Sequence, residues 1–418
     1  MREQARKLPV SCAAWVTLAA LCASVPARAG GPQDFARIER GRYLTIAADC
    51  AACHTDPVSN SAFAGGRSIE TPFGMVAAPN ITPDRQTGIG TWSDSDFDRA
   101  LRQGVRPDGK RLYPAMPYLY FTRMSREDVL SIRAYLNTVA SVHHAVRANL
   151  LPFPFNIRGL MRVWDAWYFT PGEYKPDHAK SPSWNRGAYL VEGPGHCAAC
   201  HSPKNFLGAD RADQRFHGYS LQGWFAPNIT ADRQRGLGNW SDTDILEYLK
   251  KGHNRLAAAS GPMAEEVENS SSKMTDADLA AIATYLKDQP GETADTQRIA
   301  ETDRYMKVGA AIYSDRCAAC HKLDGTGVAY LIPNLAESSS VNSRQPLTAL
   351  RVILRGTRTV ATRSEPTGPA MPSFGWQLND AEVAAVATYI RNSWGHAASR
   401  VTAEDVSKAR KSLAARRD

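Results

Sequence analysis

The chain has 418 residues, of which 43% are hydrophobic and 22% are charged, and its formal net charge is +8. A chain of this length is typical of two or three domains. The composition is that of a globular protein, which excludes disorder, collagen and coiled coil as descriptions of the whole. Eight cysteines are too few for a scaffold held together by disulfide bonds, so their positions matter more than their number.

The N-terminal residues have the pattern of a secretory signal peptide. A basic start precedes an apolar stretch over residues 10–25, and Ala27-Arg28-Ala29 provides small side chains where a signal peptidase reads. We therefore predict that residues 1–29 are removed on export; the alternative is an uncleaved anchor, although the stretch is shorter than the roughly twenty residues that span a bilayer. Export also removes Cys12 and Cys22 and leaves six cysteines.

The six remaining cysteines form three copies of one motif. The sequence Cys-Ala-Ala-Cys-His occurs at residues 50–54, 197–201 and 317–321. C-x-x-C-H is the attachment signature of c-type haem, in which two thiols add to the two vinyl groups and the histidine is the proximal iron ligand. The sequence therefore predicts three covalently bound haems c. Their attachment residues are Cys50, Cys53, Cys197, Cys200, Cys317 and Cys320, and their proximal ligands are His54, His201 and His321.

Two other readings of a cysteine pair agree less well with this pattern. A thioredoxin-like C-x-x-C needs neither the following histidine nor three copies. A structural zinc site needs four ligands for each metal, whereas each motif offers three and no cysteine is left over. Export favours haem as well, because haem is attached covalently outside the bacterial cytoplasm.

Three methionines are candidates for the sixth iron ligand. Met116 and Met263 each lie 63 residues after the second cysteine of their motif, as duplicated domains would place them. Met371 lies 51 residues after its own, but in a Pro-Ala-Met-Pro sequence that also surrounds Met116. The alternative is that these methionines fill the core. Bis-histidine coordination is the weaker hypothesis, since the remaining histidines occupy unmatched positions. A His/Met iron has both axial sites filled, so it carries electrons and binds no substrate.

Each motif stands in the same order of parts, which indicates internal duplication. A helical stretch with a glycine and an aromatic residue comes first, as in Gly41 with Tyr43, Gly187 with Tyr189 and Gly309 with Tyr313. After each methionine comes an amphipathic helix that opens with capping-box spacing, at Ser125 with Asp128, Thr275 with Asp278 and Asn379 with Glu382. The glycine allows the last helix to cross the first closely, so that a small helical shell closes around a haem.

We therefore predict an all-α chain of three tandem, class I-like cytochrome c domains. The domains are residues 30–146, 176–290 and 303–397, the connectors are 147–175 and 291–302, and a basic tail occupies 398–418. The first connector is rich in proline and aromatic residues, so we expect it to be packed between domains or to form a docking surface. The second reads as a plain linker. The tail suits an anionic membrane surface, with a solvated helix as the alternative.

Two further residue types are predicted around each haem. Pro79, Pro227 and Pro333 are candidates to accept a hydrogen bond from the proximal imidazole, with an ordinary turn proline as the alternative. Trp92 and Trp240 are candidates to donate to haem propionates, with core aromatics as the alternative.

Several longer segments extend the pattern beyond the haem motif. They are Thr71-Pro72-Phe73-Gly74, Leu112-Tyr113-Pro114-Ala115-Met116-Pro117-Tyr118, Asn185-Arg186-Gly187-Ala188-Tyr189-Leu190-Val191, Gly261-Pro262-Met263-Ala264 and Tyr389-Ile390-Arg391-Asn392-Ser393-Trp394. With these segments the chain resembles the triheme cytochrome c subunit of membrane-bound, quinone-dependent dehydrogenase complexes of Gram-negative bacteria. The resemblance implies a catalytic dehydrogenase partner of the quinoprotein, flavoprotein or molybdenum type, delivery of electrons to ubiquinone, and a place on the periplasmic side of the cytoplasmic membrane.

Two other functions remain open from the sequence. The chain could be a soluble periplasmic electron shuttle to a terminal oxidase, or a catalytic cytochrome such as a peroxidase, which requires an open axial position. Nucleic acid is not an expected partner. The mature chain has a net charge of +5, and three haems bring about six propionate charges, so the holoprotein is expected to be close to neutral.

Overall fold

The computed structural model describes residues 32–292, 297–363 and 365–416, so the predicted signal peptide lies outside the described residues. Helices dominate, and the strands form three separate antiparallel pairs, β1 with β2, β3 with β4 and β5 with β6. The prediction of an all-α fold is confirmed at the level of class. Within the described residues, no helix combines the length and the apolar character that crossing a membrane requires.

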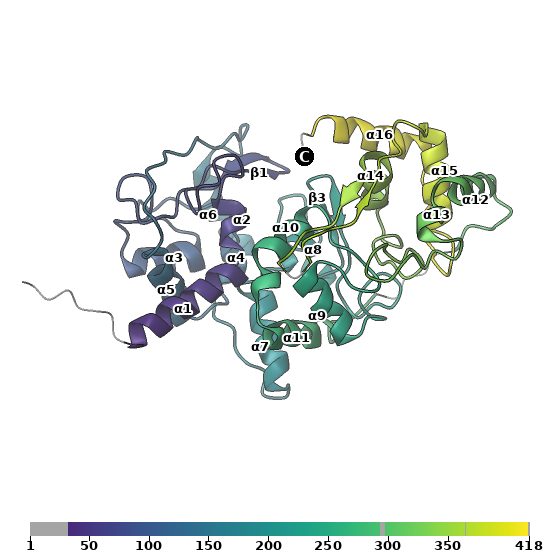
Figure 1. Ribbon diagram of the computed structural model, residues 1–418. Coiled ribbons are helices and arrows are strands. Elements are labelled where there is room, and N and C mark those ends of the chain that lie inside the picture. The colour runs from purple at the N-terminus through teal and green to yellow at the C-terminus, as the bar shows by residue number, and fades with distance from the viewer. Residues whose placement is uncertain (1–31, 293–296, 364, 417–418) are drawn as a thin grey trace, which may run out of the picture.

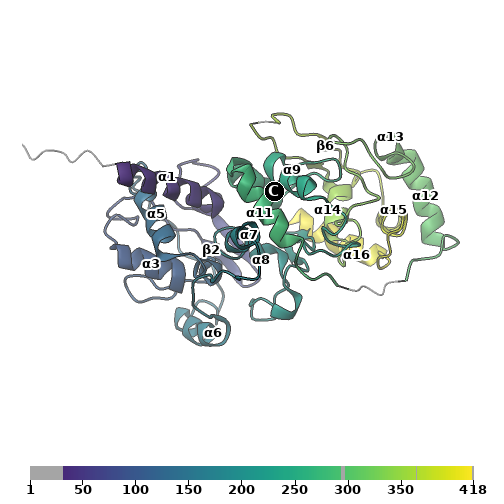
Figure 2. The same ribbon diagram turned by 90° about the horizontal axis from the view of Figure 1, so that it is seen from below.

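The elements follow one another in three similar groups. The first group contains α1 (Pro32–Ala47), α2 (Cys50–His54), β1 (Ser68–Thr71), β2 (Gly74–Ala77), α3 (Asp94–Gln103), α4 (Tyr118–Phe121) and α5 (Arg126–Leu136). The second contains α7 (Pro182–Glu192), α8 (Ala198–His201), η2 (Ala212–Gln214), β3 (Tyr219–Leu221), β4 (Trp224–Ala226), α9 (Asp242–Lys251), α10 (Pro262–Asn269), η3 (Ser271–Lys273) and α11 (Asp276–Leu286). The third contains α12 (Arg304–Arg316), α13 (Ala318–His321), α14 (Leu347–Arg355), β5 (Thr357–Arg358), β6 (Ala370–Met371), α15 (Asp380–Ile390) and α16 (Ala403–Ala414). Figure 1 and Figure 2 both place the second group between the other two.

In each group the first and last helices cross at the predicted glycine. A Cβ added to Gly41 would lie 1.8 Å from the carbonyl oxygen of Ser131, and one added to Gly187 would lie 1.9 Å from that of Ala281. Gly309 repeats the contact in the third group, at 2.3 Å from a carbonyl oxygen of α15. Helix backbones approach this closely only where no side chain intervenes. The predicted close crossing is confirmed in all three groups.

The predicted caps at the start of the last helices are present in part. Ser125, Thr275 and Asn379 each accept a hydrogen bond from the backbone three residues on. The reciprocal bond of a capping box, from the cap backbone to the acidic side chain, forms in α15, where Asn379 donates to Glu382 over 2.9 Å. In α5 and α11 the acidic side chains, Asp128 and Asp278, instead accept a hydrogen bond from a tyrosine of another domain.

The first connector is ordered and only partly buried. It contains η1 (Arg158–Leu160) and α6 (Met161–Tyr168), and Leu150 pairs with Met75 of β2. Trp164 is buried, and its indole donates a hydrogen bond to the carbonyl of Leu207 over 2.9 Å, so the connector joins the first two domains. Several of its apolar side chains nevertheless remain exposed, either to solvent or to the cavity described below: Leu150, Phe153, Phe155, Ile157, Leu160, Val163 and Trp167.

The C-terminal segment differs from the expectation of a solvated or membrane-bound tail. Its helix α16 packs against α14 and α15, and Val406, Ala409 and Leu413 are buried in the core of the third domain. Beyond the helix, Arg416 forms a bidentate ion pair with Glu70 of β1, with N to O distances of 2.6 and 2.7 Å. The apolar positions noted in the sequence therefore serve internal packing, and the end of the chain returns to the first domain (Figure 1).

Candidate functional site

One continuous cavity of about 2910 Å³ runs through all three domains. Each of the three motifs contributes its histidine and both of its cysteines to the lining. Met116, Met263 and Met371 line it as well. A pocket for one drug-sized ligand has a volume of roughly 300–1,000 Å³. The cavity therefore has room for several large cofactors, and every predicted attachment and axial residue borders it.

The three motif histidines share one hydrogen-bond arrangement. Nδ1 of His54 lies 2.7 Å from the carbonyl oxygen of Pro79, and Nδ1 of His201 lies 2.7 Å from that of Pro227. In the third domain, Nδ1 of His321 lies 3.3 Å from the carbonyl of Pro333. Because a carbonyl can only accept, Nδ1 carries the hydrogen in each case, and Nε2 is left as the nitrogen that can bind a metal.

Burial favours the form of these side chains that haem attachment uses. It lowers the pKa of His54 and His201, with the proline carbonyls acting in the opposite direction, so both imidazoles are neutral as a metal ligand must be. Burial also raises the pKa of the Cys50 and Cys197 thiols to about 12. Reactive and zinc-bound cysteines require a stabilised thiolate, which these apolar surroundings disfavour.

The three candidate methionine ligands come from different local structures. Met116 lies in the loop before α4, Met263 is the second residue of α10, and Met371 belongs to β6. Gly261 has a positive φ of 58°, and a Cβ there would lie 2.3 Å from the ring of Trp224, so a glycine is required two residues before Met263. The structure brings all three methionines to the cavity, and their role as iron ligands stays a prediction.

Trp240 has a buried indole N–H that could donate a hydrogen bond to a haem propionate. The indole lines the cavity, and its Nε1 is buried without a hydrogen-bond partner among the described residues. A buried N–H without an acceptor is costly, so an anionic oxygen at this position would stabilise it. Trp92 also lines the cavity. The carbonyl of each tryptophan accepts a bond from a cationic side chain, that of Arg133 in α5 for Trp92 and that of Lys287, directly after α11, for Trp240.

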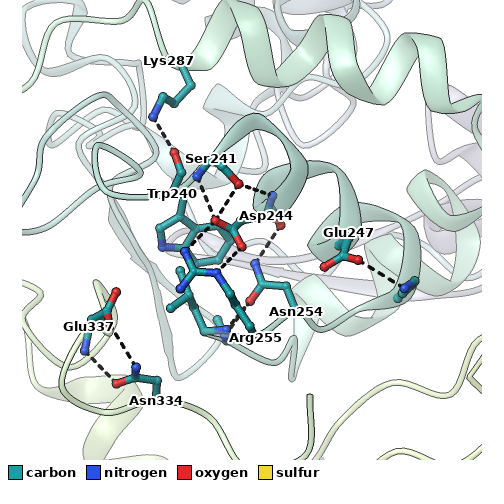
Figure 3. A network of polar contacts seen from close by, with 12 residues as sticks. Trp240, Ser241, Asp244, Glu247, Asn254, Arg255, Lys287, Asn334 and Glu337 are labelled. Carbon is teal, nitrogen blue, oxygen red and sulfur yellow. Dashed lines mark hydrogen bonds and ion pairs between the residues drawn. The ribbon is translucent and has the colours of Figure 1, made fainter. Parts of the chain in front are cut away.

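A polar network holds the Trp240 segment in place (Figure 3). Ser241 and Asp244 form a complete capping box at the start of α9. Arg255 binds both carboxylate oxygens of Asp244, at 2.9 and 3.0 Å, and Asn254 donates to the Asp244 carbonyl over 2.7 Å. The hydrogen bonds and the burial of Asp244 fix the helix start, and with it the tryptophan that precedes it.

The first two sites face each other across a domain boundary, which the sequence did not predict. His196, just before the second motif, places its ring 5.7 Å from that of Phe121 in the first domain. Asp49, just before the first motif, is partly buried, and this burial together with Glu266 and Glu265 of the second domain raises its pKa to about 9. Both residues have a positive φ, which is uncommon outside glycine. The sequence signal that could have found them is their position directly before a motif.

The third site is the most exposed of the three. Cys320 is exposed, whereas the other five motif cysteines are partly buried. Leu323, Tyr330 and Leu331, in the loop that follows the motif, also expose large apolar surfaces. A cofactor in this site would lie nearest to the surface of the protein.

Comparison with known proteins agrees with this architecture. The family model for cytochrome c matches residues 38–140, 185–290 and 306–394. The chain is 38% identical over 410 residues to the gluconate 2-dehydrogenase cytochrome c subunit of Pantoea cypripedii, and the match covers 93% of this chain and 92% of that protein. It is 38% identical over 403 residues to the fructose dehydrogenase cytochrome subunit of Gluconobacter japonicus, covering 89% and 82%. It is 36% identical over 397 residues to the cytochrome c subunit of a quinone alcohol dehydrogenase from Gluconacetobacter polyoxogenes, covering 90% and 85%.

The fold, the motifs and the family matches together define a c-type cytochrome with covalently bound haem. The residues around the cavity fit that group, since they supply two thiols, an oriented imidazole and a thioether in each domain. The chain belongs to the family of cytochrome c subunits of dehydrogenase complexes, as the resemblance in the sequence predicted. Its class of activity is electron transfer.

Proposed function

We propose that the chain is a triheme electron-transfer subunit, which accepts electrons from a catalytic dehydrogenase subunit and delivers them to ubiquinone at the cytoplasmic membrane. The observation that carries the proposal is the single cavity that contains three complete sets of candidate ligands. Because the second domain lies between the other two, the three sites form a continuous route through the protein (Figure 2).

Haem c supplies an iron that accepts and gives up one electron at a time. The chain's own residues determine how that iron is held. The two cysteines of each motif would anchor the ring, the histidine that the proline carbonyl orients through Nδ1 would bind the iron, and the methionine would supply the second protein ligand. An iron held by both residues would exchange electrons and offer no position to a substrate.

The partner and the acceptor are supported by the names of the relatives. These are cytochrome subunits of dehydrogenases for gluconate, fructose and alcohol, and one of them is named for quinone. A catalytic subunit of the quinoprotein, flavoprotein or molybdenum type would supply the electrons. The exposed third site offers a surface at which electrons can cross between proteins, because Cys320 lies at the surface there.

A position at the periplasmic face of the membrane is supported by two features. Residues 1–29 have the signal-peptide pattern that would export the chain. Two exposed apolar side chains of the first connector, Leu150 and Phe153, lie outside the cavity lining, and the same connector carries the exposed Arg162. Exposed apolar residues mixed with basic ones suit an anionic lipid surface. The connector is therefore a better candidate for membrane contact than the C-terminal helix, whose apolar side chains are buried.

The proposed function is tested by purifying the exported chain together with its partner. We expect the chain in the membrane fraction with a catalytic subunit, three haems for each chain by haem assay, and reduction of a ubiquinone analogue when the dehydrogenase substrate is added. Recovery of the chain alone from the soluble fraction would favour the periplasmic shuttle instead. Rapid peroxide turnover by the isolated chain would indicate an open axial site and contradict the proposal.

The methionine assignment predicts a distinct result for each site. Replacing Met116, Met263 or Met371 with alanine is expected to remove one His/Met low-spin signature of three and to lower the reduction potential of that haem, because a thioether ligand raises the potential. Absorption and electron paramagnetic resonance spectra of the oxidised protein measure this. The matched control is Met306→Ala, which removes a buried methionine of α12 that lies away from the cavity lining. If the variants of Met116, Met263 and Met371 each keep all three His/Met signatures, the ligand assignment is wrong.

A further inference from the structure

The first two domains exchange a matching pair of contacts. The hydroxyl of Tyr43 in α1 donates to Asp278 of α11 over 2.5 Å. The hydroxyl of Tyr189 in α7 donates in the same way to Asp128 of α5. Each tyrosine stands two residues after the crossing glycine of its domain, and each aspartate is the third residue of its helix. The two contacts therefore repeat with the domains interchanged, as in an interface between two copies of one fold.

Each tyrosine also completes the helix cap of the opposite domain. The backbone N–H of Ser125 donates to the Tyr189 hydroxyl over 3.4 Å, and that of Thr275 donates to the Tyr43 hydroxyl over 3.3 Å. In the third domain the corresponding N–H of Asn379 is satisfied by its own helix. In a complete capping box the acidic side chain accepts from the N-cap N–H. Here the tyrosine hydroxyl of the neighbouring domain accepts that bond, and the aspartate accepts a bond from the same hydroxyl.

Charged partners strengthen both contacts. Arg186 binds Asp278 through two hydrogen bonds of 2.8 Å, and Arg40 binds Asp128 at 2.5 Å. Burial alone would raise the pKa of Asp278, but the bonds from Arg186 and Tyr43 hold that pKa below its usual range. Both aspartates are buried, so loss of the tyrosine hydroxyl would leave part of a buried carboxylate without its donor.

These contacts lie on the helices that lead into the first two haem motifs. Helix α1 ends at Ala47, shortly before the first motif, and α7 ends shortly before the second. Ala47 packs in the same apolar cluster as Cys197, so the two helix ends meet where the motifs begin. The relative position of α1 and α7 therefore determines the relative position of the two sites.

The third domain does not take part in these tyrosine–aspartate contacts. The hydroxyl of Tyr313 in α12 donates within its own domain, to the carbonyl of Lys322 over 2.6 Å. The third domain joins the second through other contacts, such as the bond from the Asn334 N–H to the carbonyl of Leu256 over 3.0 Å. The first two sites are thus related to each other by a contact pattern that the third lacks.

We propose that Tyr43 and Tyr189, through Asp278 and Asp128, are positioning residues that hold the first and second haem sites at a fixed separation, so that these two haems exchange electrons as a coupled pair. The inference rests on the proposed function, because it requires haem in both sites. The tyrosines act through helix position and touch no reacting atom.

The test uses the full-length oxidised protein and its Y43F/Y189F variant. Pulsed electron paramagnetic resonance measures the distances between the ferric haems. The variants C50S/C53S and C197S/C200S remove the first and the second haem respectively. The distance between these two haems is therefore the one that is missing from both variants. We expect this distance distribution to shift and broaden in Y43F/Y189F, and electron exchange between the two haems after flash reduction to slow. The matched control Y313F removes a hydroxyl bond within one domain and is expected to leave this distribution unchanged.

Two measurements keep the result interpretable. D128N/D278N keeps an oxygen that accepts from each tyrosine, so it is expected to retain a narrower distribution than Y43F/Y189F. If the double tyrosine variant loses haem, the single variant Y43F is measured and is expected to broaden the distribution as well. An unchanged distribution in a tyrosine variant with full haem content would overturn the inference. Fewer than three haems in the unmodified chain would instead contradict the proposed function.

Discussion

Replacing Gly187 with alanine is expected to destabilise the second domain and to prevent it from retaining haem. The added Cβ would lie 1.9 Å from the carbonyl oxygen of Ala281 and 2.9 Å from the Cβ of Tyr285, so α7 and α11 would have to separate. A clash with backbone cannot be relieved by a change of rotamer, and we expect a loss of about 3 kcal/mol or more in the free energy of unfolding. Thermal unfolding and haem assay measure the effect, with haem content expected to fall from three to two.

The control for this variant is Gly159→Ala in η1. A Cβ at Gly159 meets no atom within 4 Å, so the same chemical change is expected to leave both the unfolding temperature and the haem content unaltered. If G187A unfolds at the temperature of the unmodified protein and holds three haems, the close helix crossing does not limit the stability of the domain.

The parts that local sequence determines could be predicted well. The haem motif depends on residues within one helical turn, and the crossing glycines recur before each motif because the two helix backbones touch there. The proline carbonyls could also be placed beside the histidines, since a repeated Ala-Pro-Asn segment follows the first two motifs at a similar interval. These features repeat in the sequence because they serve the same local geometry in each domain.

The parts that depend on contacts between domains could not be predicted in the same way. The spacing of Ser125 and Asp128 indicated a capping box, but the aspartate binds a tyrosine 61 residues away in the sequence, in another domain. Likewise the apolar positions of α16 gave no indication whether they would meet lipid or protein. In the structure they meet the third domain, because α14 and α15 leave an apolar surface that α16 covers.

The charge around the cavity agrees with the interpretation of the basic composition. Ten basic side chains line the cavity, against five acidic ones. The basic residues are Arg67, Arg85, Arg106, Arg147, Arg158, Lys204, Arg351, Arg355, Arg358 and Arg416, and the acidic ones are Asp49, Glu70, Glu265, Glu266 and Glu337. An excess of positive charge at this place would stabilise the propionates of the proposed haems. The basic composition of the chain thus matches the charge that the proposed haems would bring.

Replacing Cys197 and Cys200 with serine is expected to interrupt electron flow through the chain. The second domain lies between the other two, so loss of its haem would leave a gap between the remaining sites (Figure 1). We expect haem content to fall from three to two, and the ubiquinone-analogue reductase rate of the complex to fall to that of the catalytic subunit alone. Steady-state assay of the complex with its dehydrogenase substrate measures the rate.

A second readout separates an interrupted route from a misfolded protein. In C197S/C200S, the dehydrogenase substrate should reduce only the haem on the partner's side of the gap, whereas a small chemical reductant such as dithionite should reduce both. The matched variants C50S/C53S and C317S/C320S remove a haem at one end, so the two haems left in each are neighbours and should be reduced together or not at all. If substrate reduces both haems of C197S/C200S as fast as in the unmodified complex, electrons do not pass through the second domain, and the three sites do not act as a series.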